Sequence, residues 1–335
     1  MAELILSVGI VAFNEEACLP ELLSDLLAQN YPKKNTEILL INSLSSDQTP
    51  QIFQKFQAEY GALYHDVKVL ENPGKIQAAG WNVAIENFTG DALIRVDAHA
   101  KLTKDFIFQN ARCLLSGEMM CGGKRPNIIK NPTAPKRLVL MADNSMFGGS
   151  FMSYHSSDTK HYTDSVFHGC YRREVIERVG LFNEKLGRTE DNDYNYRVRA
   201  VGYKIAYDPN IVSYQYSRGS LSASLRQKFG NGYWIGRTTA ISPKCISLFH
   251  YMPFLFLLAL IFTVFLGLFG IWWPLLLLAV AYGAADFLLS VLSVLSEKPF
   301  SPLFVALPVL FLLLHVSYGV GTLCGFFSLL KRQKW

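Results

Sequence analysis

The segment ALIRVDAHAK, Ala92 to Lys101, is a short apolar run that ends on an acid, a small residue and a histidine. Such a run, bounded by polar residues, predicts a buried strand, and ligands of open α/β sheets bind just beyond the carboxyl ends of strands. Asp97 and His99 would then stand at the mouth of a site. Side chains two positions apart on an extended segment share a side, so one divalent cation could bridge both to a phosphate. The alternative is a strand whose last acid caps a turn.

Three further strands alternate with helices upstream of this segment. The strands are predicted at Leu4 to Val11, Glu37 to Ile41 and Val67 to Leu70. The helices are predicted over Leu19 to Leu27, from Asp47 and Pro50 onward, and up to Asn87. This alternation predicts right-handed βαβ units, and therefore an α/β, Rossmann-like domain with a mainly parallel sheet.

Polar loops follow three of these strands at one edge of the predicted sheet. They comprise Ala12 to Glu16, Asn42 to Asp47 and Asp97 to Ala100. Each alone is typical of an ordinary βα loop, but their convergence favours a nucleotide site. We expect the nucleotide to meet residues from all three loops, namely Phe13, Glu15, Asn42, Asp47 and Asp97.

A second acidic cluster, Thr189-Glu190-Asp191-Asn192-Asp193, heads a predicted helix. The helix dipole stabilises acids at this position, so a purely structural role is the competing interpretation. Between the two clusters, Gly122 to Tyr162 is rich in Gly, Ser, Asn, Pro and Met. This composition predicts a long loop or flap over a site rather than a packed layer.

Charged residues are concentrated before Pro253, and apolar residues dominate the sequence from there to Leu330. Stretches of about 20 apolar residues predict transmembrane helices. Three are present, at Leu248 to Gly270, Trp272 to Leu295 and Pro302 to Leu330. The net charge of +5 is modest, and no interleaving of aromatic and basic residues typical of RNA binders is obvious, so we expect no nucleic-acid partner.

We therefore predict three parts: an α/β domain over residues 1–218, an amphipathic interfacial segment over 219–247, and about three transmembrane helices over 248–330. An ordinary helix of the soluble domain is the alternative for the middle part. Basic residues precede the first span and follow the last one, and both favour the cytoplasmic side, which an odd number of full spans cannot satisfy. Pro302 and Pro308 leave room for a re-entrant third segment.

The first apolar run is too short for a secretory signal, and it lacks a basic region before it. The six cysteines have no CxxC spacing, so we expect thiols in a reducing compartment. Together these features predict that the α/β domain stays on the cytoplasmic side of the membrane.

Several segments resemble the membrane-attached family 2 glycosyltransferases of the GT-A fold. The matching segments are VAFNEE (11–16), EILLINSLSSDQT (37–49), NPGKIQAAGWNVAI (72–85), RVDAH (95–99) and TEDNDYNYRVRAVGYKIAYDP (189–209). RVDAH stands where the family has D-x-D. The DAH triplet, with RGSL and RQKFGNGYW between residues 218 and 234, is most similar to bacterial exopolysaccharide glycosyltransferases of the succinoglycan-assembly type.

The resemblance implies a nucleotide-sugar site at the predicted loops. The residues implied to bind the donor are Phe13, Glu15, Asn42, Lys75 and Asp97. Asp97 and His99 would hold Mg²⁺ or Mn²⁺, and Asp191, with Glu190 beside it, would be the catalytic base. The acceptor side would include Arg172, Gln227, Tyr233 and Trp234.

Three departures from the family pattern matter. Val11 replaces a Pro, and Asn42-Ser43-Leu44 replaces Asp-Asp-Gly, which weakens the inference about the nucleotide base. His99 replaces an acid, so the metal would be held mainly by Asp97 and the diphosphate.

By this resemblance, the chain is expected to be an inverting glycosyltransferase (a hexosyltransferase) that moves a sugar from a nucleotide sugar, a UDP-sugar first of all, to a polyprenyl-diphosphate-linked saccharide. It would act in exopolysaccharide or other cell-surface glycan synthesis, as a multi-pass protein of the bacterial cytoplasmic membrane. A homo-oligomer or assembly complex is compatible with this expectation. The alternatives are a polyprenyl-phosphate sugar transferase, a processive polysaccharide synthase, and a membrane scaffold that binds a nucleotide sugar without turnover.

Overall fold

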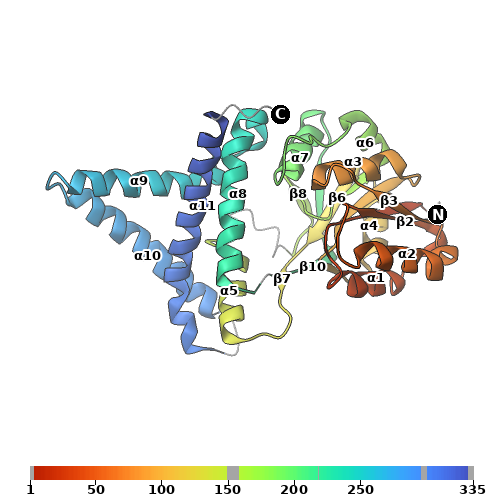
Figure 1. Cartoon of the computed structure of the whole chain (residues 1–335), viewed down its shortest axis with the longest axis horizontal. Coiled ribbons are helices and arrows are strands. Elements are labelled where there is room, and N and C mark those ends of the chain that lie inside the picture. Colours follow the sequence, from red (N-terminus) through yellow and green to blue (C-terminus); the bar gives the residue numbers. More distant parts are fainter. Residues whose placement is uncertain (1–3, 149–157, 218, 296–299, 331–335) are drawn as a thin grey trace. The chain divides into compact units, whose positions relative to one another are not determined.

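The computed structural model describes residues 4–148, 158–217, 219–295 and 300–330. The chain divides into two compact units. Unit 1 comprises residues 1–126 and 154–216, and unit 2 comprises residues 127–153 and 217–335. Unit 1 contains the sheet with its helices, and unit 2 is mostly helical (Figure 1).

Four neighbouring parallel strands form one side of the sheet in unit 1, in the order β3-β2-β1-β4, with β3 at its edge. They are β1 (Leu6–Ala12), β2 (Thr36–Asn42), β3 (Asp66–Glu71) and β4 (Ala92–Asp97). The sheet continues from β4 through β9, β6, β10 and β5, and β8 pairs with β10. These strands are β5 (Ala100–Leu102), β6 (Met120–Lys124), β8 (His161–Thr163), β9 (Cys170–Arg172) and β10 (Ile205–Tyr216). The prediction of a mainly parallel α/β sheet is confirmed.

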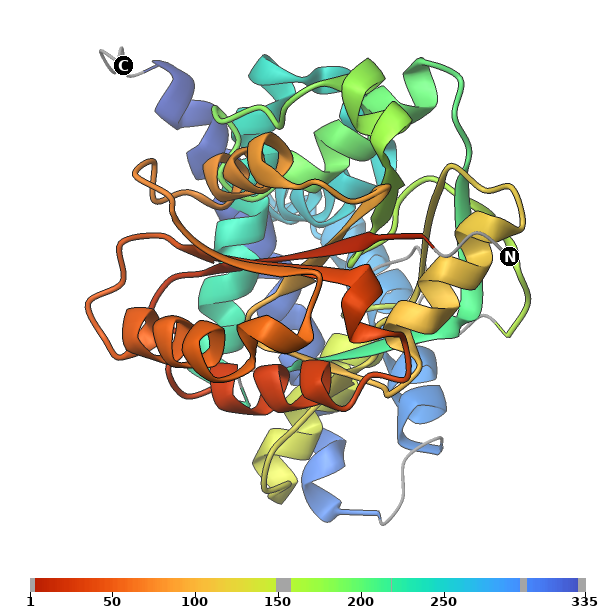
Figure 2. The ribbon, with the colours of Figure 1, turned by 90° about the vertical axis from the view of Figure 1, so that its right-hand side faces the viewer.

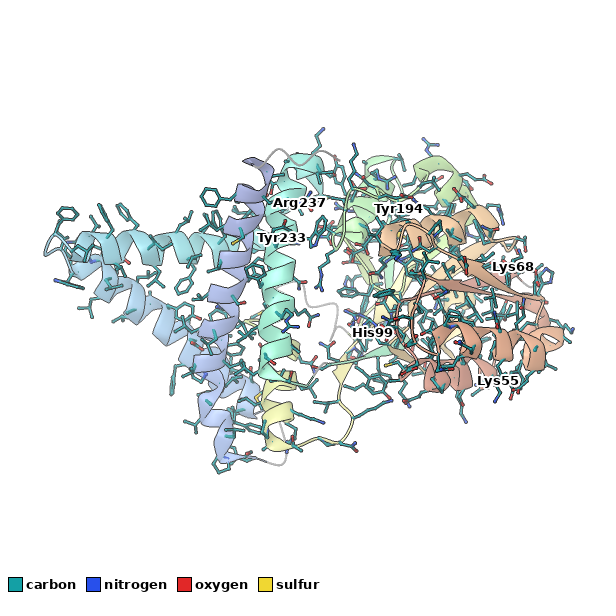
Figure 3. The ribbon with its side chains drawn as sticks, viewed as in Figure 1. Lys55, Lys68, His99, Tyr194, Tyr233 and Arg237 are labelled. Carbon is teal, nitrogen blue, oxygen red and sulfur yellow. The ribbon has the colours of Figure 1, made fainter. Side chains whose placement is uncertain are left out.

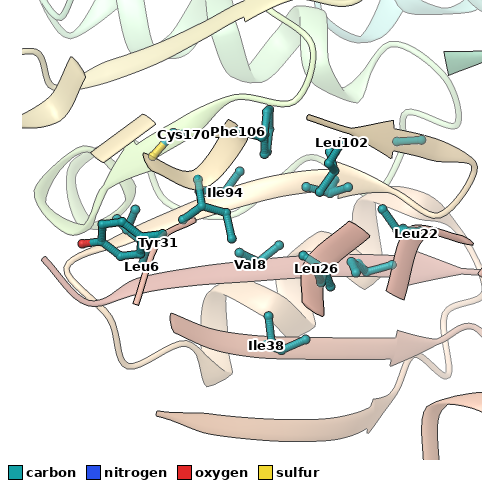
Figure 4. Close-up of a cluster of buried hydrophobic side chains, with 14 of the residues drawn as sticks. Leu6, Val8, Leu22, Leu26, Tyr31, Ile38, Ile94, Leu102, Phe106 and Cys170 are labelled. Atoms are coloured by element: carbon teal, nitrogen blue, oxygen red, sulfur yellow. The ribbon is translucent and has the colours of Figure 1, made fainter. Parts of the chain in front are cut away.

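Helices cover both faces of this sheet (Figure 2). One face is covered by α1 (Leu19–Leu27), α2 (Thr49–Tyr60) and α4 (Phe106–Leu115). The other face is covered by α3 (Gln77–Asn87), α6 (Arg173–Val179) and α7 (Glu190–Ala200). Figure 4 shows the first of these cores, in which Leu22 and Leu26 of α1 lie over Val8 of β1. Burial on both faces explains why the central strands read as nearly continuous apolar runs.

Unit 2 consists mainly of helices. Its elements are β7 (Asn127–Ile128), α5 (Ala134–Asn144), α8 (Leu221–Ile241), α9 (Met252–Gly267), α10 (Trp273–Leu295) and α11 (Leu307–Leu330). Among the described residues, three segments are long and apolar enough to cross a membrane: Leu248–Gly267, Trp273–Leu295 and Pro302–Leu329.

The prediction of an unpacked loop over Gly122 to Tyr162 is wrong for part of that stretch. Residues Ala134–Asn144 form helix α5, whose Met141 and Ala142 pack against Phe311 of α11. The partners of this helix lie more than 150 residues further along the chain, so local composition did not reveal its packing. Residues 149–157 of the predicted flap lie outside the described part of the chain.

A buried carboxylate ties three strands of unit 1 together. Glu37 of β2 is fully buried and accepts hydrogen bonds from Lys68 Nζ at 2.8 Å, from the Thr89 backbone at 2.8 Å, and from the Ser7 hydroxyl. Burial alone would raise the pKa of Glu37, but these donors outweigh it and lower the pKa below its ordinary value of 4.5. Glu37 is therefore a paired internal charge.

Replacing Glu37 with Ala is expected to destabilise unit 1 by about 2–4 kcal/mol, because the Lys68 ammonium and the Thr89 amide would lose a buried acceptor. Urea denaturation of the full chain in detergent measures this change.

The matched control is Glu59→Ala, which removes an exposed partner 3.8 Å from Lys55 on α2 (Lys55 and Lys68 are labelled in Figure 3). It should cost less than about 0.5 kcal/mol. Because the folded pKa of Glu37 is lowered, its contribution is present above pH 4.5 and is lost as the pH falls through the folded value. Equal effects of the two substitutions at neutral pH would contradict this assignment.

Candidate active site at the carboxyl edge of the sheet

The three predicted polar loops meet at one edge of unit 1. Ala12 at the end of β1 is paired with Asn42 at the end of β2, and Val11 is paired with Asp97 at the end of β4. The carboxyl ends of these parallel strands therefore coincide, as expected for a ligand site in an open α/β sheet.

Hydrogen bonds join the first two loops to each other. Asn14, with φ of 55°, accepts from the Ser46 backbone at 2.8 Å, and Asp47 accepts from the Glu16 backbone at 3.0 Å. The Phe13 ring is left 54% exposed beside this junction. A fixed pair of loops with an exposed aromatic ring is suited to stacking against a planar ligand.

Asn42 and Lys75 occupy different environments at this edge. Asn42 is buried, and its Oδ1 accepts from the Ser45 backbone at 3.0 Å, so this side chain shapes its own loop. Lys75 is exposed and has φ of 59° in the turn that follows β3. The Lys75 side chain can therefore meet a ligand from solvent, whereas the Asn42 side chain is buried.

Asp97 is held from two sides. Its Oδ1 accepts from Gln77 Nε2 at 3.2 Å, and its Oδ2 lies 3.4 Å from Nε2 of the buried His168. His168 is itself fixed by Ser213, whose Oγ lies 2.8 Å from His168 Nδ1. Burial would raise the pKa of Asp97, but His168, His99 and Arg125 outweigh it and hold the pKa well below its usual range. Asp97 is therefore an ionised carboxylate surrounded by basic side chains.

His99 is engaged through both ring nitrogens. Its Nδ1 lies 3.7 Å from Glu15 Oε1, and its Nε2 lies 2.6 Å from the side-chain amide of Gln215. Burial would lower the pKa of His99, but Glu15 and Asp97 outweigh it and raise the pKa. These contacts favour the imidazolium form, which donates from both nitrogens and has no lone pair for a metal.

The side chains at this edge fit a metal ion whose ligands come largely from the phosphates of the substrate. Among the described residues, no group of three or more His, Cys, Asp and Glu side chains could hold a metal ion. Asp97 supplies one ionised carboxylate, and Mg²⁺ commonly uses one or two carboxylates together with substrate phosphates. The metal role of Asp97 therefore remains a consistent prediction, and the metal role of His99 requires loss of its proton.

The second cluster lies at the head of α7 and is linked to β4 by Arg95. Arg95 is buried two residues before Asp97, and its guanidinium lies 4.6 Å from the Trp81 ring and 4.9 Å from the Phe182 ring. Its terminal nitrogen lies 4.0 Å from Glu190 Oε1. Tyr194 anchors α7 by stacking on Phe182, with the ring centroids 4.0 Å apart (Tyr194 is labelled in Figure 3).

Two adjacent acids at the start of α7 have raised pKa values. Burial and the neighbouring charge of Asp191 raise the pKa of Glu190 to about 7, although Arg95 opposes the shift. Burial also raises the pKa of Asp191, against the opposing effect of Arg95, and Asp97 raises it further. Within the described residues, Glu190 Oε2 has no hydrogen-bond partner. This pair can take up a proton near neutral pH.

Arg172 does not reach this edge. It is paired with Ala92, at the opposite end of β4 from Asp97, and it donates to the backbone oxygens of Leu114 at 2.7 Å and Glu118 at 3.1 Å. The prediction that placed Arg172 on the acceptor side is therefore corrected, because its donors are used to join β9 to the end of α4.

Gln227, Tyr233 and Trp234 lie on α8 in unit 2. The rings of Tyr233 and Trp234 are 6.1 Å apart, and the Arg237 guanidinium lies 5.1 Å from the Trp234 ring (Tyr233 and Arg237 are labelled in Figure 3). Their role towards an acceptor remains a prediction.

Three basic residues near the site acids, Arg95, His168 and Arg125, were not predicted from the sequence. Arg95 could have been found, because it is two positions from Asp97 and therefore shares its face of the strand. His168 and Arg125 come from distant segments, and no local pattern connects them with Asp97.

Comparison with known proteins identifies the family of the chain. Residues 7–180 match the family described as glycosyl transferase family 2. The chain is 27% identical, over 94% of its length and 95% of the relative, to a dolichyl N-acetyl-alpha-D-glucosaminyl phosphate 3-beta-D-2,3-diacetamido-2,3-dideoxy-beta-D-glucuronosyltransferase of Methanococcus voltae. It is 25% identical, over 68% of each chain, to the succinoglycan biosynthesis protein ExoA of Rhizobium meliloti.

The fold is also shared with a solved structure. The mannosyltransferase PcManGT from Pyrobaculum calidifontis, in complex with GDP-Man and Mn²⁺, superposes with a TM-score of 0.61 at 17% identity, over 96% of this chain and 88% of that one. The family match covers β1, β2 and β4 with the loops that follow them, and it ends before the acid pair at the head of α7. The chain belongs to glycosyl transferase family 2 and is a glycosyltransferase, with a GT-A-like domain followed by C-terminal helices that include three long enough and apolar enough to span a membrane.

Proposed function

We propose that this glycosyltransferase moves a sugar from a nucleotide-sugar donor, a UDP-sugar in the first instance, to a lipid-linked saccharide, with inversion at the anomeric carbon. One observation carries the proposal: Arg95, two residues before the ionised Asp97 on β4, lies against Glu190, which with Asp191 forms an acid pair of raised pKa. Glycosyl transfer needs both kinds of group, one at the departing diphosphate and one at the attacking hydroxyl.

Asp97 is assigned to the donor. Mg²⁺ or Mn²⁺, when bound, neutralises charge on the diphosphate, and Asp97 is the residue that would hold it. The cations His99 and Arg125 lie within electrostatic reach of Asp97 and complement a diphosphate directly. The exposed Phe13 ring and Glu15 are assigned to the nucleoside, with Lys75 nearby at the same edge.

Asp191 is assigned as the base that takes the proton from the acceptor hydroxyl. Its raised pKa suits that task near neutral pH. Glu190, whose Oε1 faces Arg95, modulates this basicity through its own charge. When the hydroxyl attacks from the face opposite the leaving diphosphate, a single displacement inverts the configuration of the sugar.

The assignment of a lipid-linked acceptor is supported by the apolar helices of unit 2 and by the relatives. The Methanococcus voltae relative is named for transfer to a sugar on dolichyl phosphate, and the Rhizobium meliloti relative for succinoglycan biosynthesis. Anchoring in a bilayer raises the effective concentration of an acceptor that cannot leave it. We assign the reaction to the cytoplasmic face of the cytoplasmic membrane, where nucleotide sugars are available.

The direct test measures nucleotide release by the purified chain in detergent, with a mixture of polyprenyl-linked acceptors. The donors are UDP-glucose, UDP-galactose, UDP-N-acetylglucosamine and GDP-mannose, each with and without Mg²⁺ or Mn²⁺. We expect one donor to be consumed in a metal-dependent way. Asp191→Asn should reduce transfer by about 10²–10⁴-fold, because the general base is lost, while donor affinity stays nearly unchanged.

Asp97→Ala is the complementary variant, and it should weaken metal-dependent donor binding itself. Retained turnover in Asp191→Asn would remove Asp191 from the role of base. If every donor stays intact in the wild type while one still binds, the chain is a nucleotide-sugar-binding scaffold instead.

The pH dependence should reveal the acid pair. Because the pKa of Glu190 is raised to about 7, its ionisation adds a negative charge beside Asp191 across that pH and makes Asp191 a stronger base. We expect kcat/KM to rise through an inflection near pH 7. Glu190→Gln cannot ionise and should lose this inflection.

The matched control for that profile is Asp193→Asn. Asp193 lies on the same helix, but its carboxylate is paired with Arg197 at 2.8 Å, so the control should keep the inflection. An inflection that survives in Glu190→Gln would assign the titration to another group.

A further inference from the structure

Helices α8 and α11 of unit 2 lie side by side in unusually close contact (Figure 1). A Cβ on Gly232 of α8 would stand 2.0 Å from the Tyr318 oxygen, and one on Gly321 of α11 would stand 2.1 Å from the Phe229 oxygen. Gly236 and Gly325 repeat the arrangement one turn later. Only glycine permits this approach of two backbones.

The two helices run in the same direction with matched turns. Ser317 Oγ donates to the Leu225 oxygen at 2.8 Å, Gly321 lies against Phe229, and Gly325 lies against Tyr233. Each step advances four residues on both helices. In a bilayer, paired turns of α8 and α11 would therefore lie at closely similar depths.

Helix α8 is too polar for the hydrocarbon core. It carries five strongly polar side chains: Arg226, Gln227, Lys228, Asn231 and Arg237. Lys228 Nζ donates to the Gly148 oxygen at 2.5 Å and faces Asp143, and burial lowers the pKa of Lys228. Cations at the centre of a bilayer are costly, so α8 belongs outside the core, and α11 is paired with it turn for turn.

Helix α5, which also bears charges, covers the first half of α11. Its Met141 and Ala142 pack against apolar residues at the start of α11 and in the turn before it, namely Phe304, Leu307, Leu310, Phe311 and Leu314. The same helix carries Lys136, Arg137 and Asp143. One face of α11 is thus covered along most of its length by helices that bear charges.

The opposite face of α11 is apolar and exposed. Its most exposed described residues include Val309 at 60% and Phe327 at 57%, and Val305 in the turn before α11 is 77% exposed. Buried residues make up 33% of an 18-residue apolar stretch within Pro302–Leu329, against 11% of the corresponding stretches within Leu248–Gly267 and Trp273–Leu295. A helix with one face on charged helices and the other on apolar surroundings fits the boundary of a membrane.

The α9–α10 hairpin differs from α11. Neither helix contains Lys or Arg, and the single acid, Asp286 of α10, is buried and accepts from Ser290 at 3.2 Å. The connection between the helices exposes Leu268, Phe269 and Trp272, and Trp273 is exposed at the start of α10. Asp286 is thus the one acid that would be carried into the hydrocarbon core, and it is shielded inside the protein, while the tryptophans are typical of a lipid boundary.

We infer that only the α9–α10 hairpin enters the hydrocarbon core, and that α11 lies in the membrane interface, with α5 and α8 on its aqueous side and its exposed apolar face towards lipid. The segment before α9 and the end of α11 then lie on the same side of the bilayer. This arrangement places the basic residues before α9 and those after α11 on the same, cytoplasmic side, whereas three full spans would place them on opposite sides. It does not depend on the proposed sugar donor or acceptor.

Depth measurement in reconstituted vesicles tests this inference on the full chain. A fluorescent non-canonical residue is placed at Val320 or Phe327, both exposed in the C-terminal half of α11, in phosphatidylcholine–phosphatidylglycerol vesicles, and is quenched by lipids brominated at defined acyl positions. An interfacial α11 gives equal, shallow depths. A spanning α11 gives distances from the bilayer centre that differ by about 10 Å, at 1.5 Å per residue.

Leu258 and Phe265, which are exposed near the middle and near the C-terminal end of α9, provide the matched control, and their distances from the bilayer centre should differ by about 10 Å. A gradient on α9 with none on α11 supports the inference, whereas a gradient on α11 or a flat α9 overturns it. Protease treatment of sealed vesicles adds an independent readout. Tags at the N- and C-termini should be cut together, and protection of one alone would also overturn the inference.

Discussion

The buried Arg95 is the interaction on which the candidate site depends. A guanidinium placed between Trp81 and Phe182 has lost most of its water, and such a charge requires a nearby anion. Glu190 supplies that anion from the head of α7, while Asp97 follows two residues later on the strand of Arg95. Arg95 therefore holds the head of α7 against β4, almost 100 residues away in the sequence. His168, His99 and Arg125 keep Asp97 ionised, whereas burial raises the pKa values of Glu190 and Asp191.

Local patterns predicted most of the sheet and the edge at which the site lies. The apolar runs of β1, β2 and β4 are buried on both faces, so their limits are visible in the sequence, and parallel pairing brings Ala12, Asn42 and Asp97 to one edge. The residues that support Asp97 could not be predicted from local patterns. His168 meets Asp97 through the register of β9 and β10, and Arg172 was misplaced because nothing local shows that it lies at the other end of β4.

The same limit applies to unit 2. Composition identified three apolar segments correctly, because length and hydropathy are local properties. The packing of α11 against α8 and α5 is not a local property. Gly232 and Gly236 allow close contact with α11 only because Gly321 and Gly325 lie opposite them. Hydropathy treats all three apolar helices alike, whereas packing separates a hairpin that is mostly exposed from a helix that is covered on one face by helices that bear charges.

The most direct test of the account is the configuration of the first product. If Asp191 acts as the base in a single displacement, proton NMR of the transfer product, recorded at early times, will show an anomeric configuration opposite to that of the nucleotide sugar. An α-linked donor would give a β-linked product. A product that keeps the donor's configuration would contradict a single displacement, and with it the separate roles assigned to Asp97 and Asp191.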